Sequence, residues 1–201
     1  MLTVITPIEA ELIDRLTAIV RAAPSLMRVL ETARALHLPD WLVFSGAVYQ
    51  PVLNHLTGRP PDHGVRDYDL GYFDASDISY EAEDGVIRLV AAAFDDELRN
   101  VVEVRNQARV HLWFEDHFGE AYTPLSYTAE ALERFVSPMF AVGVRLDPGD
   151  RLHVQAPFGL ADIFALRLRP NPLRPFGNFA RVAAGVTARW PEVSVEMPDQ
   201  R

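Results

Sequence analysis

The sequence contains no cysteine in its 201 residues. Disulfide bonds, thiolate zinc sites and cysteine nucleophiles are therefore excluded together. No apolar run is long enough to cross a bilayer. The N-terminal segment MLTVITPIEAELIDRL carries acidic residues where a secretory signal needs basic ones. We therefore expect a mature cytoplasmic chain without a membrane segment.

Several familiar catalytic motifs are also missing. There is no G-x-x-x-x-G-K-[ST], no G-x-G-x-x-G and no G-x-S-x-G. Walker-type ATPases, Rossmann enzymes and α/β-hydrolases thereby lose their main sequence support. His111, Glu115 and His117 do not have the H-E-x-x-H spacing of a zinc site. Any catalytic chemistry must rest on other groups.

Positive charge is scarce relative to negative charge, and the formal net charge is −9. A surface of this sign repels a phosphate backbone, which disfavours a long nucleic acid as partner. Acidic groups gathered in one cleft would need cations to neutralise them, which favours metal binding. The hydrophobic fraction of 49% and the charged fraction of 23% are ordinary for a globular protein.

Helical and strand patterns alternate through the first part of the chain. Apolar residues at helical spacing predict helices over 8–22, 25–38, 47–58 and 79–100. Short apolar runs predict strands over 41–46, 65–73 and 101–106. This alternation predicts the α/β (α+β) class, with a small mixed sheet flanked by helices.

The rest of the chain is richer in helix. We expect helices over 107–119, 126–137, 158–170 and 177–191, a hairpin over 140–157 around the turn DPGD, and a mobile tail over 192–201. Two parts follow from this reading. A core with N-terminal helices spans 1–125, and a helical and hairpin part over 126–201 packs with it as one unit.

Two aspartates stand one residue apart in the stretch VRDYDLGYFD, although strands usually exclude Asp. Because strand side chains alternate, Asp67 and Asp69 point to one face. The residues between and after them, Tyr68, Leu70 and Tyr72, point to the core. Two carboxylates this close raise each other's pKa unless a cation lies between them, and Mg²⁺ prefers such ligands. The plain alternative, a pair of exposed edge residues that limit aggregation, stays open.

A turn of small residues precedes this stretch. Ser45 and Gly46 join the strand over 41–46 to the following helix. The first N–H groups of a helix can bind a phosphate, and small residues let it approach. A simple capped turn is the alternative reading of the same residues.

Glu103, Arg105 and Arg109 follow in the stretch VVEVRNQARVH. Glu103 is a lone acid among β-branched residues, and it can join Asp67 and Asp69 if the two strands are neighbours. A surface residue on an edge strand is the alternative. Arg105 and Arg109 stand four residues apart, where they could meet a triphosphate or pair with the acidic groups.

The motifs follow one another in a fixed order: first a strand, the turn SGA and a helix, then RDYDLGYFD, and then an acid on a later strand. In this order of motifs the sequence resembles the nucleotidyltransferase superfamily with the DNA-polymerase-β-like fold. The stretches GAVYQPVLNHLTG, DYDLGYFD, VRNQARVHLWFEDHFG, APFGLADIFALRLRPNP and RVAAGVTARWP are similar to a bacterial group described only as nucleotidyltransferase-family proteins. This resemblance spans roughly residues 41–191 and specifies the group rather than a substrate.

The resemblance implies transfer of a nucleoside monophosphate from a nucleoside triphosphate to a hydroxyl of a small molecule or a protein, with release of pyrophosphate. It implies that Mg²⁺ or Mn²⁺ is held on the phosphates by two aspartates, with a third carboxylate at the catalytic metal. The small-residue turn would lie against the β- and γ-phosphates. The candidate residues are Asp67, Asp69 and Glu103 for catalysis and metal binding, and Ser45, Gly46, Arg105 and Arg109 for nucleotide binding.

The sequence also departs from the superfamily pattern. Ala47 stands where Gly or Ser usually follows the glycine, and the span from Gly46 to Asp67 is longer than in compact members. Two alternatives therefore stay open. One is a module that binds nucleotide without turnover and acts through a protein partner, and the other is a metal-dependent phosphohydrolase that uses the same carboxylates.

Overall fold

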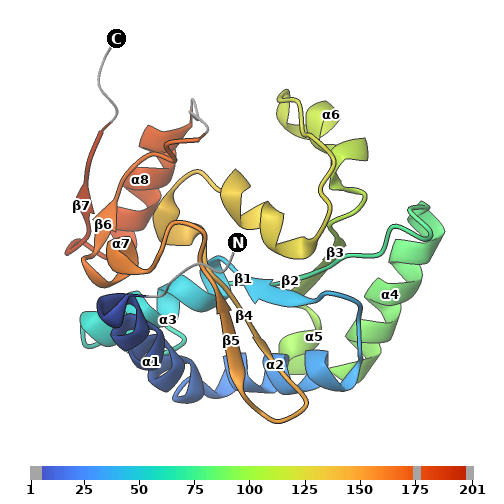
Figure 1. Cartoon of the computed structure of the whole chain (residues 1–201), viewed down its shortest axis with the longest axis horizontal. Helices are drawn as coiled ribbons and strands as arrows, with labels where there is room; N and C mark the ends of the chain where they lie inside the picture. The colour runs from blue at the N-terminus through green and yellow to red at the C-terminus, as the bar shows by residue number, and fades with distance from the viewer. Residues whose placement is uncertain (1–5, 174–177, 198–201) are drawn as a thin grey trace.

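A mixed five-stranded sheet forms the centre of the protein, as seen in a computed structural model that describes residues 6–173 and 178–197 (Figure 1). The strand order is β3-β2-β1-β4-β5. The strands are β1 (Leu42–Phe44), β2 (Tyr68–Tyr72), β3 (Val102–Asn106), β4 (Gly143–Leu146) and β5 (Leu152–Gln155). β2 and β3 run parallel, and the other neighbouring pairs are antiparallel. The predicted fold class, α+β with a small mixed sheet, is confirmed.

Helices flank this sheet on both faces. The α-helices are α1 (Pro7–Arg21), α2 (Pro24–Ala35), α3 (Gly46–Leu56), α4 (Tyr80–Ala93), α5 (Asp96–Arg99), α6 (Phe114–Phe118), α7 (Ala161–Phe164) and α8 (Phe179–Arg189). The described residues also form the 3₁₀ segments η1 (Val110–Leu112), η2 (Thr128–Arg134) and η3 (Pro138–Phe140). In Figure 1, α1 and α2 lie below the sheet, whereas α6 and the yellow segment that contains η2 lie above it.

The lower face of the sheet carries the main core. Val43, Leu70 and Val104 are directly opposite one another on β1, β2 and β3. All three are buried in one cluster with Leu16 of α1 and Leu30 of α2. Because each fully buried aliphatic side chain contributes about 1.5–3 kcal/mol, this face supplies most of the apolar stabilisation.

The upper face carries a smaller cluster made of Leu42, Phe44, Leu132 and Ala141. Two glycines make room for its side chains. A Cβ on Gly71 would lie 2.5 Å from the ring of Phe44, and one on Gly143 would lie 2.5 Å from the side chain of Leu42. Neither position accepts a side chain unless these neighbours move, so the glycines let the Phe44 ring lie across β2.

Side-chain caps start two of the long helices. Thr6 accepts a hydrogen bond from the N–H of Glu9, and Pro7 occupies the first turn of α1. Ser79 accepts a hydrogen bond from the N–H of Ala82 at the start of α4. The predicted helix start near Ser79 is therefore confirmed.

The predicted single helix over 79–100 is wrong, because the chain breaks it into α4 and α5. Phe94 has ψ 148° and is buried, which carries the backbone out of the helix. Asp95 then caps α5, where its carboxylate accepts the N–H of Leu98. A buried aromatic anchor thus outweighs the helical propensity of the run.

The predicted helices over 107–119 and 126–137 are also shorter than expected. The first is η1 followed by α6, and Gly119 ends α6 at φ +70° as predicted. The second is the 3₁₀ segment η2, whose first residue is fixed by a distant loop. The N–H of Thr128 donates to a carboxylate oxygen of Asp40 at 2.7 Å, and its hydroxyl donates to the Asp40 carbonyl.

The C-terminal segment differs most from its prediction. The helix expected over 158–170 is only α7, because Leu166 adopts φ +51°. The chain then forms β6 (Arg167–Leu168), which pairs in parallel with β7 (Ser194–Val195). Part of the tail predicted to be mobile therefore lies in a strand, and its last residues, 198–201, lie outside the described residues.

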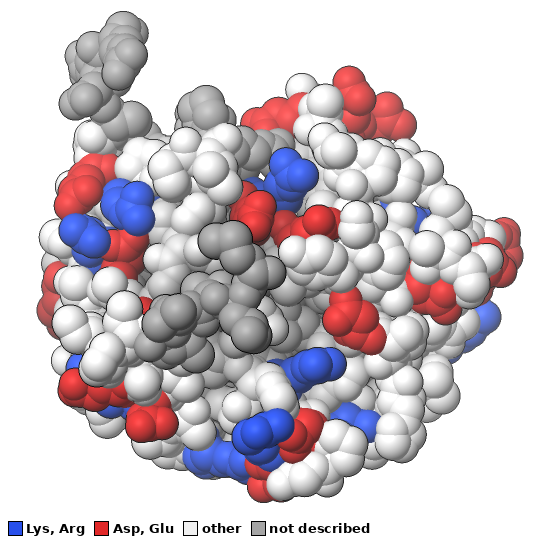
Figure 2. All heavy atoms as spheres, viewed as in Figure 1, with Lys and Arg blue, Asp and Glu red and all other residues white. Residues whose placement is uncertain are grey.

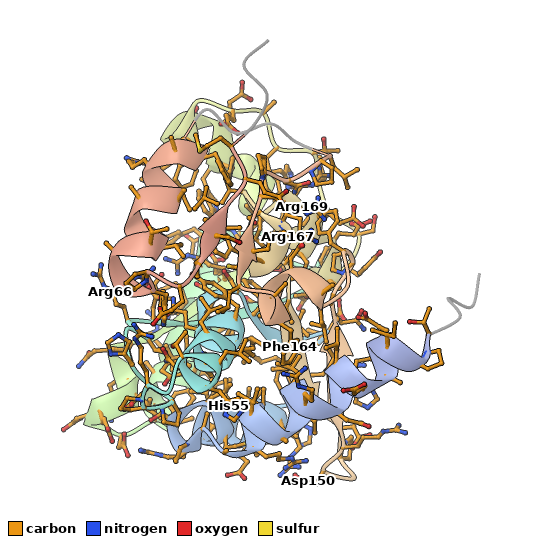
Figure 3. The ribbon with its side chains drawn as sticks, turned by 90° about the vertical axis from the view of Figure 1, so that its left-hand side faces the viewer. His55, Arg66, Asp150, Phe164, Arg167 and Arg169 are labelled. Atoms are coloured by element: carbon orange, nitrogen blue, oxygen red, sulfur yellow. The ribbon has the colours of Figure 1, made fainter. Side chains whose placement is uncertain are left out.

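The predicted hairpin is present as β4 and β5. Asp150 in its turn accepts hydrogen bonds from Arg21 of α1 at 2.9 Å and from Arg34 of α2 at 2.8 Å. Figure 3 shows Asp150 at the lower edge of the molecule, beside α1. Because β4 pairs with β1, residues on both sides of the predicted boundary at 125 share one sheet, and that boundary stays a prediction. Within the described ranges, no helix combines the length and the apolarity that crossing a bilayer requires.

Candidate active site

Three side chains form a row across the upper face of the sheet. Phe44 of β1 is opposite Asp69 of β2, and Asp69 is opposite Glu103 of β3. Directly opposite residues share a face, so the parallel register brings Asp69 and Glu103 to the same side. The sequence required β2 and β3 to be neighbours for this meeting, and they are.

The environment of Asp69 opposes its negative charge. Burial and, to a smaller extent, the negative charges of Asp67 and Glu103 together raise the pKa of this carboxyl to about 7. Arg105 acts in the opposite direction. A cation close to Asp69 would offset the repulsion from these two neighbouring charges.

The predicted small-residue turn lies at the end of β1, next to Asp67. Ser45 has φ +57° and ψ −123°, a conformation that a residue with a side chain rarely adopts. Its N–H donates to the carbonyl of Val142 at 2.9 Å, and α3 begins at Gly46. A Cβ on Gly46 would lie 3.9 Å from a carboxylate oxygen of Asp67. The N-terminus of α3 and Asp67 are therefore close together.

Gln50, one turn into α3, covers this point. Its Nε2 atom lies 2.9 Å from where a Cβ of Gly46 would be, and its side chain is buried. Within the described part of the chain, its Oε1 atom is buried and has no hydrogen-bond partner. A buried carbonyl oxygen without a donor costs about 1–3 kcal/mol, which points to a ligand at this place.

Tyr49 and Arg189 complete the surroundings of Gln50. Burial raises the pKa of Tyr49, hydrogen bonding from Gln50 and the charge of Arg189 lower it, and the charge of Asp67 raises it. The Arg189 guanidinium at the end of α8 also donates to the carbonyl of Gly64 at 3.2 Å. A cation from a distant part of the chain thus lies near Tyr49.

Neither Gln50 nor Arg189 is predicted as a site residue from the sequence. Gln50 stands inside the largely buried helix α3 and belongs to no motif. Arg189 is far from the carboxylates along the chain, and only the packing of α8 brings it close. A polar residue one helical turn after the Ser45–Gly46 turn was the one signal that pointed to Gln50.

The two arginines predicted for nucleotide binding lie in different places. Arg105 lines the cavity beside Asp69. Arg109 forms an ion pair with Glu83 of α4, and its Nε donates to the carbonyl of Ile78 at 3.3 Å. The structure therefore brings Arg105 to the carboxylates and does not bring Arg109 there.

A cavity of about 210 Å³ opens beside the carboxylate row. Its polar lining includes Asp69, Glu103, Arg105 and Arg134. The rest of the lining is mainly aromatic and apolar, with Phe44, Val110, Trp113, Phe114, Tyr122 and Phe135. Figure 2 shows acidic and basic side chains interspersed on the face of the molecule that it draws. Charged groups thus meet an aromatic wall at one place.

The carboxylates fit a divalent cation by their chemistry. Asp67, Asp69 and Glu103 offer oxygen ligands, which Mg²⁺ and Mn²⁺ accept. Burial and the neighbouring acidic groups raise the pKa of Asp69, so a cation bound there would stabilise its charged form. In the residues that the structure describes, however, no three acidic or histidine side chains are gathered closely enough to surround an ion.

Comparison with known proteins bears on the whole chain. A family model described as Nucleotidyltransferase matches residues 31–195. The chain is also similar to a solved structure described as the NMR structure of a protein that reveals a CCA-adding enzyme head domain. The TM-score is 0.72 at 22% identity, over 98% of each chain. At this identity, the likeness shows a shared fold. No curated protein matches the chain.

Proposed function

Because this chain belongs to a nucleotidyltransferase family, we propose that it moves a nucleoside monophosphate from a nucleoside triphosphate to a hydroxyl group, with release of pyrophosphate. One observation carries the proposal. Asp69 and Glu103 lie side by side on one face of the sheet, and Asp67 lies beside the N-terminus of α3. Carboxylates for a metal and backbone donors for a phosphate therefore lie within one small region.

The carboxylates are proposed to hold Mg²⁺ or Mn²⁺. Asp67, Asp69 and Glu103 would supply its oxygen ligands. When bound, the ion neutralises phosphate charge and stabilises the attacking and leaving oxygens of an in-line displacement. Glu103 is exposed at the edge of the cavity, where its carboxylate would accept the proton of the attacking hydroxyl.

The turn at the end of β1 is proposed to bind the β- and γ-phosphates. The first N–H groups of α3 have no carbonyl of their own helix as partner, and the helix dipole favours an anion there. Gly46 has no side chain to keep a phosphate away, and Gln50 places its amide against the same point. Ser45, Gly46 and Gln50 thus form the donor side, with Arg105 across the carboxylates.

The acceptor is a hydroxyl-bearing small molecule or a protein side chain in this proposal. The net charge of −9 disfavours a long nucleic acid in that role. The proposed compartment is the cytoplasm. Arg109 has no part in the proposed site, because Glu83 holds it elsewhere.

A second candidate function is that of a module that binds a nucleotide without turnover and acts through a protein partner. It is favoured by the carboxylates, which are not gathered around one point in the described residues, and by Ala47 after the glycine. Such a module would bind a nucleoside triphosphate and release no pyrophosphate.

Pyrophosphate release tests the proposal. The protein is incubated with each common nucleoside triphosphate, Mg²⁺ or Mn²⁺, and a panel of hydroxyl compounds. Asp69→Asn should reduce release about a thousandfold, because metal stabilisation supplies several kcal/mol of the barrier reduction. Asp74→Asn, just beyond β2, is the matched control and should leave the rate unchanged. Nucleotide binding without release would favour the second candidate, and release of orthophosphate without an acceptor would favour hydrolysis.

A further inference from the structure

The cavity beside Asp69 and Glu103 lies away from the proposed phosphate turn. Among the described residues that line it, Asp69, Glu103 and Arg105 come from the sheet, whereas Ser45, Gly46 and Asp67 are not part of the lining. Asp69 and Glu103 thus line this cavity, whereas the turn with Gln50 lies beside Asp67.

In-line displacement requires the attacking oxygen and the leaving oxygen to lie on opposite sides of the α-phosphorus. If the leaving pyrophosphate rests on the turn, the attacking hydroxyl arrives from the Glu103 side. Building on the proposed function, we propose that this cavity is the acceptor subsite, and that it takes a single aromatic ring that carries the attacking hydroxyl.

An aromatic wall gives the cavity its preference for a ring. The rings of Phe114 and Tyr122 have centroids 4.6 Å apart, and those of Trp113 and Phe114 are 6.1 Å apart. Aromatic pairs at such separations contribute beyond simple burial when the rings are offset or edge-on. A ring that enters the cavity meets three aromatic neighbours from one segment of the chain.

Arg134 borders this wall. Its guanidinium lies 5.8 Å from the ring centroid of Tyr122. Its Nε atom is buried and, within the part of the chain described, has no hydrogen-bond partner. A buried donor of this kind is available to a polar substituent on the ring.

Size and charge narrow the class of acceptor. A cavity of about 150 Å³ holds benzene, so the 210 Å³ here fits one ring with a small substituent. Two carboxylates and two arginines line the cavity, which gives no net charge for an ionic head group. A neutral phenol-like acceptor fits both limits.

The chemical step balances as a simple substitution. The ring hydroxyl oxygen forms a bond to the α-phosphorus, and the bond from that phosphorus to the bridging oxygen of the β-phosphate breaks. The proton passes to the Glu103 carboxylate and then to water. The products are an aryl nucleoside phosphodiester and pyrophosphate.

Binding of 4-methylphenol to the nucleotide-free protein tests the subsite. Trp113 fluorescence and ligand-observed NMR should both report binding, since the other two tryptophans, Trp41 and Trp190, are buried elsewhere. Trp113→Ala should weaken binding about tenfold, as loss of a stacking wall predicts. Ala131→Phe, which fills the cavity, should abolish it. Leu112→Ala is the matched control, because Leu112 is exposed in the same segment and outside the lining.

Two outcomes would overturn the inference. The first is 4-methylphenol binding that is absent or is indifferent to Trp113→Ala. The second is uracil binding that depends on Trp113 while 4-methylphenol binding does not, which would assign the cavity to the base of the donor.

Turnover separates this inference from the proposed function. Pyrophosphate release that rises with 4-methylphenol and falls in Trp113→Ala supports both. Release that is indifferent to ring compounds overturns the acceptor subsite alone. Binding in the cavity without pyrophosphate release from any triphosphate overturns the proposed function and the acceptor role with it, and leaves a ring-binding cavity.

Discussion

The side chains on the two faces of the five-residue strand β2 lie in opposite environments. On the lower face, Leu70 is buried in the main core, between Val43 of β1 and Val104 of β3. On the upper face, Asp69 lines a cavity and lies close to the acidic side chains of Asp67 and Glu103. The first arrangement stabilises the fold, and the second costs free energy that a ligand would recover. The difference shows that adjacent residues of one strand can have separate roles, one face of the strand contributing to stability and the other to the candidate site.

The largest predicted effect separates Leu70 from Asp69. Leu70→Ala should lower the free energy of unfolding by about 2–5 kcal/mol, because it leaves a cavity in the packed core. Asp69→Asn should leave the metal-free protein as stable as before or more so, because the neutral amide removes one of three like charges. Urea unfolding of both variants measures this. A loss of stability in Asp69→Asn as large as in Leu70→Ala would show that the division by face is wrong.

A second prediction concerns the glycine under the Phe44 ring. Gly71→Ala should destabilise the protein by about 1–3 kcal/mol, because its methyl group would meet that ring at 2.5 Å. Gly85→Ala in α4 is the control, since no atom lies within 4 Å of its new methyl group. It should instead stabilise by up to about 1 kcal/mol through helix propensity. Thermal unfolding of the pair measures both signs, and equal effects would remove the packing explanation.

A third prediction sharpens the contrast within α3. Gln50→Met keeps the size of the side chain and removes the buried oxygen without a partner. The free energy of unfolding should therefore rise by about 1 kcal/mol, while the affinity for a nucleoside triphosphate falls. Chemical denaturation and calorimetric titration give the two numbers. Unchanged nucleotide affinity would mean that Gln50 is a packing residue only.

The smallest predicted effect lies at the β4–β5 hairpin. A hydrogen bond from His153, with others from the turn, lowers the pKa of Asp147 from 3.8 to about 2. Its folded-state pKa lies below the unfolded value, so its contribution is present above pH 3.8 and is lost as the pH falls through about 2. Hydrogen exchange of the hairpin amides should quicken over this range. Asp147→Asn should remove the pH dependence there and leave exchange in β2 unchanged.

The sequence was sufficient where local patterns decide the structure. Alternation in VRDYDLGYFD placed Tyr68 and Leu70 in the core and Asp69 on the other face, as the structure has them. The strand, small turn and helix around Gly46 were also readable, because each has a local cause. The meeting of Glu103 with Asp69 was predicted on the assumption that its strand lies beside β2.

The rest depended on contacts between distant parts of the chain. Arg109 resembles a phosphate ligand by its spacing, yet the buried carboxylate of Glu83 on α4 holds it away from the cavity. Arg189 reaches the surroundings of Tyr49 only through the packing of α8. Leu166 adopts a left-handed conformation that no local residue pattern announces. Contacts between distant residues determine each of these positions, so a short stretch of sequence does not predict them.

The cavity has a floor and a wall of separate origin. Its floor comes from Phe44, Asp69 and Glu103 on three strands that the main core fixes in place, and its wall comes from Trp113, Phe114 and Tyr122 in one surface segment. Substitutions in that segment can reshape the wall without disturbing the sheet beneath it. Substitutions confined to this one segment could therefore change which compounds fit the cavity, while Asp69 and Glu103 keep their positions on the sheet.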